Sequence, residues 1–274
     1  MSNKILTVVV PSYNMEKYLP KCLGSLIVAP ELMDRLEVLV VNDGSKDRTS
    51  EIAHDFESRY PAVFNVIDKE NGHYGSCINA ALKVATGEYV KILDADDSFD
   101  TSAFAQYMSF LIERVEGEWS CEADLILNAF VWEDEAGSVC KTMYRKMPEQ
   151  ELCEIEDDRV ALNGIYMHQV AYRTVALREM GYVQQEGISY TDDEWCHSPM
   201  TMVRKLAYCP VVLYKYLIGR TGQSMDPAVR MKNLWMVEKV TLRMARDAET
   251  CSCRVEKIRA YMREFACAII SDVY

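Results

Sequence analysis

Residues 36–60 read LEVLVVNDGSKDRTSEIAHDFESRY. They begin with an unbroken apolar run, Leu36–Val41, which predicts a β-strand covered on both faces. After a polar turn, apolar residues recur with helical spacing at Ile52, Phe56 and Tyr60, which predicts an α-helix. The stretch is therefore typical of one strand–helix unit of an α/β protein.

The same alternation extends over the first hundred residues. It predicts a doubly wound, mostly parallel sheet flanked by helices, in which ligands bind beyond the carboxyl ends of the strands. The predicted strands are Ile5–Val10, Leu36–Val41, Val63–Ile67 and Tyr89–Leu93, and the predicted helices are Tyr18–Ile27, Thr49–Tyr60 and Gly75–Ala85.

Beyond residue 100 the pattern is looser, and the chain closes with helical spacing. The elements we expect there are a helix at Ser102–Val115, strands at Asp124–Trp132, Val139–Tyr144 and Val211–Leu217, an extended stretch at Met167–Arg173, an acidic loop at Ser189–Trp195, and helices at Met231–Arg246 and Val255–Ile270.

The composition argues against nucleic-acid binding. Thirty Lys and Arg against 42 Asp and Glu give a formal net charge of -12, so an anionic substrate needs a local device such as a metal ion.

No apolar stretch reaches the roughly 18 residues of a membrane span, and the N-terminus lacks the pattern of a signal peptide. Ten scattered cysteines fit a reduced compartment. We expect a cytoplasmic protein, and peripheral contact with the inner face of the membrane stays open.

Two carboxylates follow the strand Tyr89–Leu93 directly. Asp94 and Asp96 stand at positions i and i+2, so an extended backbone aims both at one point. Paired carboxylate oxygens suit Mg²⁺ or Mn²⁺, which are commonly held together with substrate phosphates. The alternative is an acidic turn in which Asp97 or Ser98 caps the following helix.

Asp43 and Gly44 close the second predicted strand. An aspartate there can accept a hydrogen bond from a base imide or a ribose hydroxyl, and the glycine lets a ligand approach the turn. The alternative is an ordinary Asp-Gly turn with Asp47 or Thr49 capping the next helix.

Asn71, Gly72 and His73 precede the third predicted helix, whose exposed N–H groups form a natural phosphate-facing site. His73 adds a further donor, or it is a surface or packing residue. Asn79, one turn later, either points into the same crevice or hydrogen-bonds a neighbouring loop.

Taken together, these segments resemble glycosyltransferase family 2 in content, order and spacing. The resemblance implies a GT-A fold with a helical C-terminal extension. It implies a glycosyltransferase domain over residues 1–225, with a nucleotide-binding half at 1–100 and an acceptor-side half at 101–225, followed by C-terminal helices at 226–274. The segments that carry it are Val8–Asn14, Val40–Thr49, Asn71–Gly75, Ala85–Tyr89 and Leu93–Asp97.

The resemblance also implies a site for a nucleotide-diphosphate sugar and a divalent cation, Mg²⁺ or Mn²⁺. In that site Pro11 and Tyr13 line the base pocket, and Asp43 binds the base. Asn71 and Gly72 belong to the nucleotide site. Asp96 binds the metal and diphosphate, and Asp94 lies on the ribose side with a second role as metal ligand.

The second half matches the family more sparsely. Gly187–Trp195 resembles the acceptor-side acidic motif, with Asp192 at the position of the catalytic base. Thr191 stands where this motif usually has Glu, which leaves the register of the match open and makes Asp193 the second candidate for the base. The alternative is a solvated acidic loop in which one of these aspartates caps a helix starting at Glu194. Further on, Arg220 or Ser224 is expected to close over the diphosphate.

The function implied is metal-dependent, inverting transfer of one hexosyl or N-acetylhexosaminyl group from a nucleotide sugar, with UDP-sugars expected. The acceptor implied is a hydroxyl of a sugar or lipid-linked glycan, and the process is cell-surface polysaccharide synthesis. The Gln-x-x-Arg-Trp motif of processive members is absent, which favours single-sugar transfer. Two alternatives stay open. The first is a sugar nucleotidyltransferase, which needs a Gly-rich basic loop to stabilise a triphosphate after the first strand, whereas residues 11–14 read PSYN. The second is a non-catalytic nucleotide-sugar-binding protein, in which Thr191 would reflect degeneration of the acceptor site.

Overall fold

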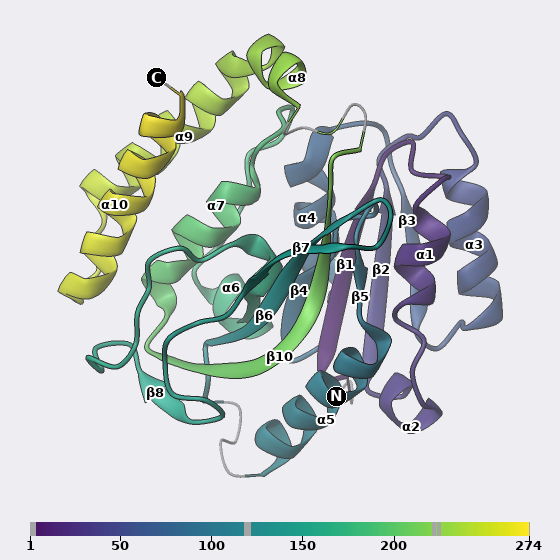
Figure 1. Ribbon diagram of the computed structural model, residues 1–274, viewed down its shortest axis with the longest axis horizontal. Helices are drawn as coiled ribbons and strands as arrows, with labels where there is room; N and C mark the ends of the chain where they lie inside the picture. Colours follow the sequence, from purple (N-terminus) through teal and green to yellow (C-terminus); the bar gives the residue numbers. More distant parts are fainter. Residues whose placement is uncertain (1–3, 118–121, 221–222, 224–225, 274) are drawn as a thin grey trace.

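In the computed structural model, which describes residues 4–117, 122–220, 223 and 226–273, ten strands form one mixed sheet with helices on both faces (Figure 1). The strand order is β3-β2-β1-β4-β9-β6-β10-β5, with β7 beside β6 and β8 beside β10. The strands are β1 Leu6–Ser12, β2 Leu36–Asn42, β3 Phe64–Asp68, β4 Tyr89–Ile92, β5 Ser98–Phe99, β6 Leu125–Asp134, β7 Val139–Met143, β8 Leu152–Glu154, β9 Val170–Arg173 and β10 Lys205–Ile218.

The first half forms the parallel sheet that the sequence predicts. β3, β2, β1 and β4 are mutually parallel, and the predicted positions of their strands and intervening helices are confirmed within a few residues. The helices are α1 Leu19–Gly24, α2 Pro30–Met33, α3 Thr49–Arg59 and α4 His73–Val84.

Two apolar cores lie on opposite faces of this sheet, which explains the unbroken apolar runs of its strands. In β1, Val8 and Val10 belong to the core that includes Phe56 of α3, whereas Val9 points to the core that includes Ile78 of α4. Successive side chains of a strand point to opposite faces, so a strand covered on both sides has no polar alternation.

The second half of the sheet is mixed. β9 is antiparallel to both β4 and β6, and β6 is parallel to β10. A short turn containing Gly137 joins β6 to β7, and such a connection permits only antiparallel pairing. Of the stretch expected to be extended, Met167–Gln169 forms a short 3-10 helix, η1, and only Val170–Arg173 is a strand.

The remaining helices cover this half and end the chain. α9 and α10 lie side by side near α7 in Figure 1, and the Tyr261 hydroxyl of α10 donates to the carbonyl of Cys196 in α7 at 2.8 Å. No helix within the described ranges has the length and apolar character needed to cross a bilayer. The helices are α5 Thr101–Glu116, α6 Thr174–Glu179, α7 Asp192–His197, η2 Ser198–Met202, α8 Pro227–Lys232, α9 Leu234–Thr250 and α10 Glu256–Val273.

Candidate active site

The loops after β1 and β2 are joined by hydrogen bonds at the carboxyl edge of the parallel strands. The Asn14 N–H donates to Ser45 Oγ at 3.0 Å, and Asn14 Oδ1 accepts from the Lys46 N–H at 2.8 Å. Asn14 has a φ of 53°, a left-handed conformation uncommon outside glycine. Next to this junction, Pro11 is half-buried in β1, and the Tyr13 side chain is exposed.

Asp43 joins the β2 loop to the loop after β3. Its Oδ1 accepts hydrogen bonds from Lys69 Nζ at 2.6 Å and from the Gly72 N–H at 2.9 Å, and its carbonyl accepts from Asn71 Nδ2 at 3.0 Å. The structure thus brings Asp43, Asn71 and Gly72 together. It also gives Asp43 a structural task that the sequence did not indicate, because the Gly72 N–H that we expected to face a phosphate is bonded to this carboxylate.

The carboxylates after β4 form a cluster in which one oxygen each of Asp94, Asp96 and Asp97 lies within 4.8 Å of the others. Asp97 is buried and serves the fold: its carboxylate accepts from the Tyr214 hydroxyl at 2.6 Å and the Leu217 N–H at 2.7 Å. Asp94 and Asp96 are therefore the pair available to a ligand.

The helix-cap alternative for this turn is wrong. Asp100, not Asp97 or Ser98, caps α5, since its side chain accepts from the Ala103 N–H at 3.0 Å. The sequence analysis missed Asp100 because each of several polar residues in the turn is an acceptable cap.

Burial and crowding raise the pKa of Asp94 from 3.8 to about 8, first through desolvation and then through the charges of Asp96 and Asp192. Closely spaced carboxylates repel one another when ionised, and a divalent cation with oxygen ligands relieves that repulsion. The donor set therefore fits Mg²⁺ or Mn²⁺.

Tyr74, in the first turn of α4, contacts the same cluster. Its hydroxyl donates to Asp94 Oδ1 at 2.9 Å and lies 3.6 Å from the sulfur of Met167. The sequence analysis passed over this residue, because nothing in a helical pattern distinguishes a core tyrosine from one that orients a carboxylate.

Arg220, beyond the end of β10, reaches the cluster from the other side. Its Nε lies 2.5 Å from Asp96 Oδ2, both side chains are largely buried, and its guanidinium lies 5.6 Å from the ring centre of Tyr18. The expected proximity of Arg220 to the metal and diphosphate position is thus present as a direct ion pair. Ser224, the other residue expected to close over the diphosphate, falls outside the described residues.

The acidic segment is helical from Asp192 onward rather than a loop through Trp195. α7 begins at Asp192, and Thr191 occupies its N-cap position, so the interpretation in which an aspartate caps a helix from Glu194 is wrong. Three acidic residues in the first turn favour a helix here, because their negative charges interact favourably with the positive end of the helix dipole.

Asp192 lies near enough to the carboxylate cluster for its charge to act on it. Its charge raises the pKa of both Asp94 and Tyr74, and burial raises its own pKa. A carboxylate whose pKa is shifted toward neutrality is a better proton acceptor for catalysis than an ordinary aspartate. The arrangement therefore places an acid–base group next to a candidate metal site.

A hydrogen-bonded frame holds α7 against α4. Asn79 binds the backbone of Gln184 through both amide atoms, as donor at 2.9 Å and as acceptor at 2.9 Å. Gln184 Nε2 in turn donates to the Thr191 carbonyl at 2.7 Å and to its hydroxyl at 3.0 Å. Of the two roles considered for Asn79, the structure supports the neighbouring-loop contact.

Glu194 strengthens this frame from the first turn of α7. Its buried carboxylate accepts from the Gln185 N–H at 3.0 Å and from Arg243 Nη1 at 3.1 Å. Gly75 of α4 packs so closely on this segment that a Cβ would lie 1.9 Å from the Gln185 carbonyl oxygen. His73 also reaches the segment, with Nδ1 3.4 Å from Ser189 Oγ.

A cavity of about 330 Å³ opens beside Asp192. It lies between the segment 163–168, the start of α7 and one face of α10. Behind this wall, fully buried Lys91 of β4 donates to the carbonyls of His168 at 2.9 Å and Val170 at 3.3 Å, which fixes η1 to the sheet. The sequence presents Lys91 within an otherwise apolar strand and gives no sign of this role.

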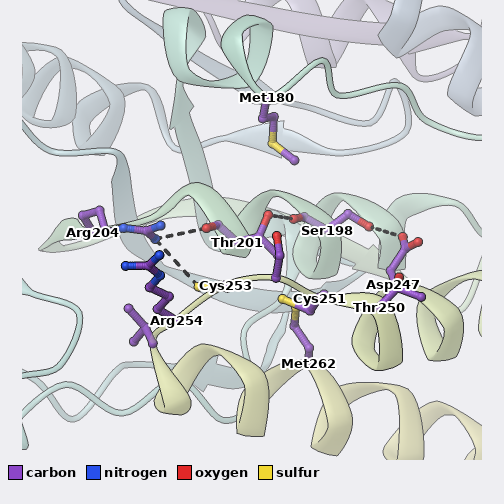
Figure 2. A pocket seen from close by; sticks show the side chains of 12 residues that line it. Met180, Ser198, Thr201, Arg204, Asp247, Thr250, Cys251, Cys253, Arg254 and Met262 are labelled. Carbon is purple, nitrogen blue, oxygen red and sulfur yellow. Dashed lines mark hydrogen bonds between the residues drawn. The ribbon is translucent and has the colours of Figure 1, made fainter.

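A second cavity, of about 620 Å³, lies between η2 and the α9–α10 connection (Figure 2). Arg204 there donates to the Thr201 carbonyl at 3.0 Å, and the Ser198 hydroxyl donates to Asp247 at 3.1 Å. Its lining residues include none of the strand-end residues described above, so the size of this cavity does not make it the candidate active site.

Comparison with known proteins identifies the first part of the chain. Residues 7–117 match the family model described as glycosyl transferase family 2. The resemblance to this family is thus confirmed for residues 7–117. The chain is 35% identical over 128 residues to the Uncharacterized glycosyltransferase MG025 homolog of Mycoplasma pneumoniae, a match that covers 46% of this chain and 39% of that protein. The chain thus spans less than half of that relative.

Solved structures show that the chain has the expected GT-A fold. S. aureus TarS 1-349 in complex with UDP-GlcNAc matches with a TM-score of 0.68 and 20% identity, over 97% of this chain and 71% of that one. Mannosyltransferase PcManGT from Pyrobaculum calidifontis, in complex with GDP-Man and Mn²⁺, matches with a TM-score of 0.59 and 17% identity, over 97% of this chain and 74% of that one.

Proposed function

We propose that this protein is a divalent-metal-dependent, inverting glycosyltransferase. It moves one sugar from a nucleotide-diphosphate sugar, with UDP-sugars as the expected donors, to a hydroxyl of a cell-surface glycan or its precursor. The observation that carries the proposal is the proximity of Asp192 to Asp94, whose pKa its charge raises, together with the cluster that Asp94 forms with Asp96. The nucleotide complexes of TarS and PcManGT and the Mn²⁺ of PcManGT support the donor and the cofactor.

Asp192 is the proposed base. It accepts the proton of the acceptor hydroxyl while that oxygen forms a bond to the anomeric carbon, and the bond from this carbon to the diphosphate oxygen breaks on the opposite face. Burial favours the proton-accepting role, since it raises the pKa of Asp192. Asp193, which follows it in the first turn of α7, is the second candidate.

Asp96, with Asp94 as its neighbour, is proposed to hold the cation, which when bound would neutralise charge on the leaving diphosphate. Tyr74 orients Asp94 through its hydrogen bond. Arg220 is placed to bind a diphosphate oxygen once it leaves Asp96. The base and ribose side of the nucleotide is proposed to bind at the joined loops at the ends of β1 to β3. The residues proposed to contact it there are Pro11, Tyr13, Asp43, Asn71 and Gly72.

Release of nucleotide from a panel of UDP- and GDP-sugars tests the proposal. With Mn²⁺ and a mixture of glycan acceptors, the wild type should release nucleotide. Asp96→Asn and Asp192→Asn should each lose about 10²-fold or more of that rate with little change in thermal stability. A wild-type protein that binds a sugar nucleotide in equilibrium dialysis yet never releases its nucleotide contradicts the proposal and favours the non-catalytic binding protein.

A further inference from the structure

We infer that the cavity beside Asp192 binds the terminal sugar of the acceptor, and that this sugar is uncharged. The inference rests on the proposed function, which it deepens by naming the acceptor class. The side chains that line the cavity come from three parts of the chain: the segment 163–168, Asp192, Asp193 and Cys196 of α7, and the α10 face formed by Tyr261, Glu264, Phe265, Ala268 and Ile269.

One wall of the cavity packs against the residues that hold the carboxylate cluster. Met167, which lines it, contacts the Tyr74 hydroxyl that donates to Asp94. His168, the next residue of the wall, packs on the ring of Tyr214 with centroids 4.7 Å apart, and Tyr214 binds Asp97. A hydroxyl-bearing group in the cavity therefore lies beside Asp192 and against a wall that contacts the carboxylate cluster through Tyr74, a position that suits an acceptor.

The charge of the lining excludes an anionic group. Asp192, Asp193 and Glu264 contribute carboxylates, whereas no Lys or Arg occurs among the described lining residues. Burial, followed by the charge of nearby Lys91, lowers the pKa of His168 to about 3, so its ring is neutral at physiological pH. Arg145 and Lys91, the cations next to this wall, are bonded to the carbonyls of Gly164 and His168 and do not line the cavity. A phosphate or a uronic acid would therefore meet like charge at the lining, whereas neutral hydroxyls can donate to the carboxylates.

The shape and the apolar part of the lining favour a sugar ring. Tyr166, Tyr261, Phe265 and Ile269 supply aromatic and aliphatic surface opposite the carboxylates. A pyranose has the matching character, with C–H groups on one face and hydroxyls at its edge. The volume of about 330 Å³ lies at the small end of ligand pockets, which span roughly 300–1,000 Å³, and suits a terminal residue better than a long glycan.

The test measures binding of octyl glycosides by saturation-transfer NMR in the presence of UDP and Mn²⁺. The probes are octyl glucoside, galactoside, mannoside and N-acetylglucosaminide, with octyl glucuronide as the anionic match. We expect at least one neutral glycoside to bind through its ring protons, and the glucuronide to bind at least tenfold more weakly. Equal binding of all five probes would show that the octyl tail occupies the cavity, and absence of binding by every neutral probe would show that no sugar does; either result overturns the inference.

Two variants of α10 complete the test. Ile269→Trp fills the cavity and should abolish glycoside binding, whereas Cys267→Trp, on an exposed position outside the lining, should leave it unchanged. Unchanged binding by Ile269→Trp also overturns the inference. Release of nucleotide to water by Cys267→Trp, the control variant, should stay within twofold of the wild type. If glycosides bind as expected but no nucleotide is ever released, the inference stands for the cavity and the proposed function fails.

Discussion

Arg220 Nε lies 2.5 Å from Asp96 Oδ2, so the carboxylate assigned to a metal ion is already ion-paired with the side chain assigned to the diphosphate. Both side chains are largely buried, which makes this contact stronger than an exposed ion pair. Metal binding to Asp96 and release of Arg220 toward the diphosphate are therefore expected to be coupled.

Arg220→Met should raise the affinity of the nucleotide-free protein for Mn²⁺. A hydrogen bond to a charged group contributes about 1.5–3 kcal/mol, so its removal should tighten Mn²⁺ binding by about tenfold or more. The same substitution should slow nucleotide release, since the diphosphate loses a partner. Electron paramagnetic resonance of free Mn²⁺ measures the affinity directly.

Lys215→Met is the matched control for this prediction. Lys215 lies on β10, five residues before Arg220 in the chain, but its Nζ pairs with Asp100 at 2.9 Å rather than with Asp94 or Asp96. Its Mn²⁺ affinity should equal that of the wild type. Equal affinities of Arg220→Met and wild type would show that Arg220 and the metal do not compete for Asp96.

Gly75→Ala should impair the acceptor side of the cleft. Alanine favours a helix by about 1 kcal/mol over glycine, but the new Cβ would lie 1.9 Å from the backbone oxygen of Gln185, and overpacking costs about 1–3 kcal/mol. The clash should prevail and displace the segment that Glu194 and Thr191 hold, so nucleotide release should fall at least tenfold. Gly24→Ala, where nothing lies within 4 Å of the new Cβ, should leave both rate and stability unchanged or slightly improved.

Tyr74→Phe should weaken Mn²⁺-dependent binding of UDP. The substitution removes the hydrogen bond to Asp94 Oδ1 while it keeps the ring, and loss of a hydrogen bond to a charged group predicts a decrease of about tenfold in affinity, measured by calorimetry. Tyr107 of α5 has a buried hydroxyl for which the described part of the chain offers no hydrogen-bond partner, so Tyr107→Phe should bind UDP as the wild type does. Equal weakening by both variants would indicate a general packing effect instead.

The stability of the metal-free protein should fall as pH rises. Asp94 has a folded-state pKa of about 8 against a usual value of 3.8, so its protonated form is favoured by folding. Its contribution is fully present below pH 3.8 and is lost as pH rises to about 8. Burial raises the pKa of Asp97 as well, which acts in the same direction.

Urea denaturation with EDTA, at pH 5 to 9, tests this dependence. The free energy of unfolding of the wild type, relative to that of Asp94→Asn, should decrease across this range, because the variant lacks the titrating group. Added Mn²⁺ should restore the wild type at the alkaline end, since the cation favours ionised carboxylates. A difference between the two proteins that does not vary with pH would contradict the assignment.

The sequence by itself determined the parallel half of the sheet and which polar residues follow its strands. The apolar runs and the turns after them are local features, and parallel strands place their carboxyl ends at one edge whatever the side chains do elsewhere. The sequence placed Asp94 and Asp96 directly after β4, but the extended backbone expected there is wrong: a turn closed by the hydrogen bond from the Asp97 N–H to the Asp94 carbonyl at 2.9 Å brings their carboxylates together.

The tertiary structure decided what these residues contact. The Arg220–Asp96 ion pair joins positions 124 residues apart in the sequence, and Asn79 hydrogen-bonds Gln184 across 105 residues. The periodicity of a helix or strand predicts no contact over such sequence separations. Sequence periodicity also did not indicate that Lys91 is buried among carbonyls, that α7 begins at Asp192, or that one face of α10 completes a cavity beside it. Such contacts depend on how separate elements pack, because burial and hydrogen-bond partners are set by neighbours in space rather than along the chain.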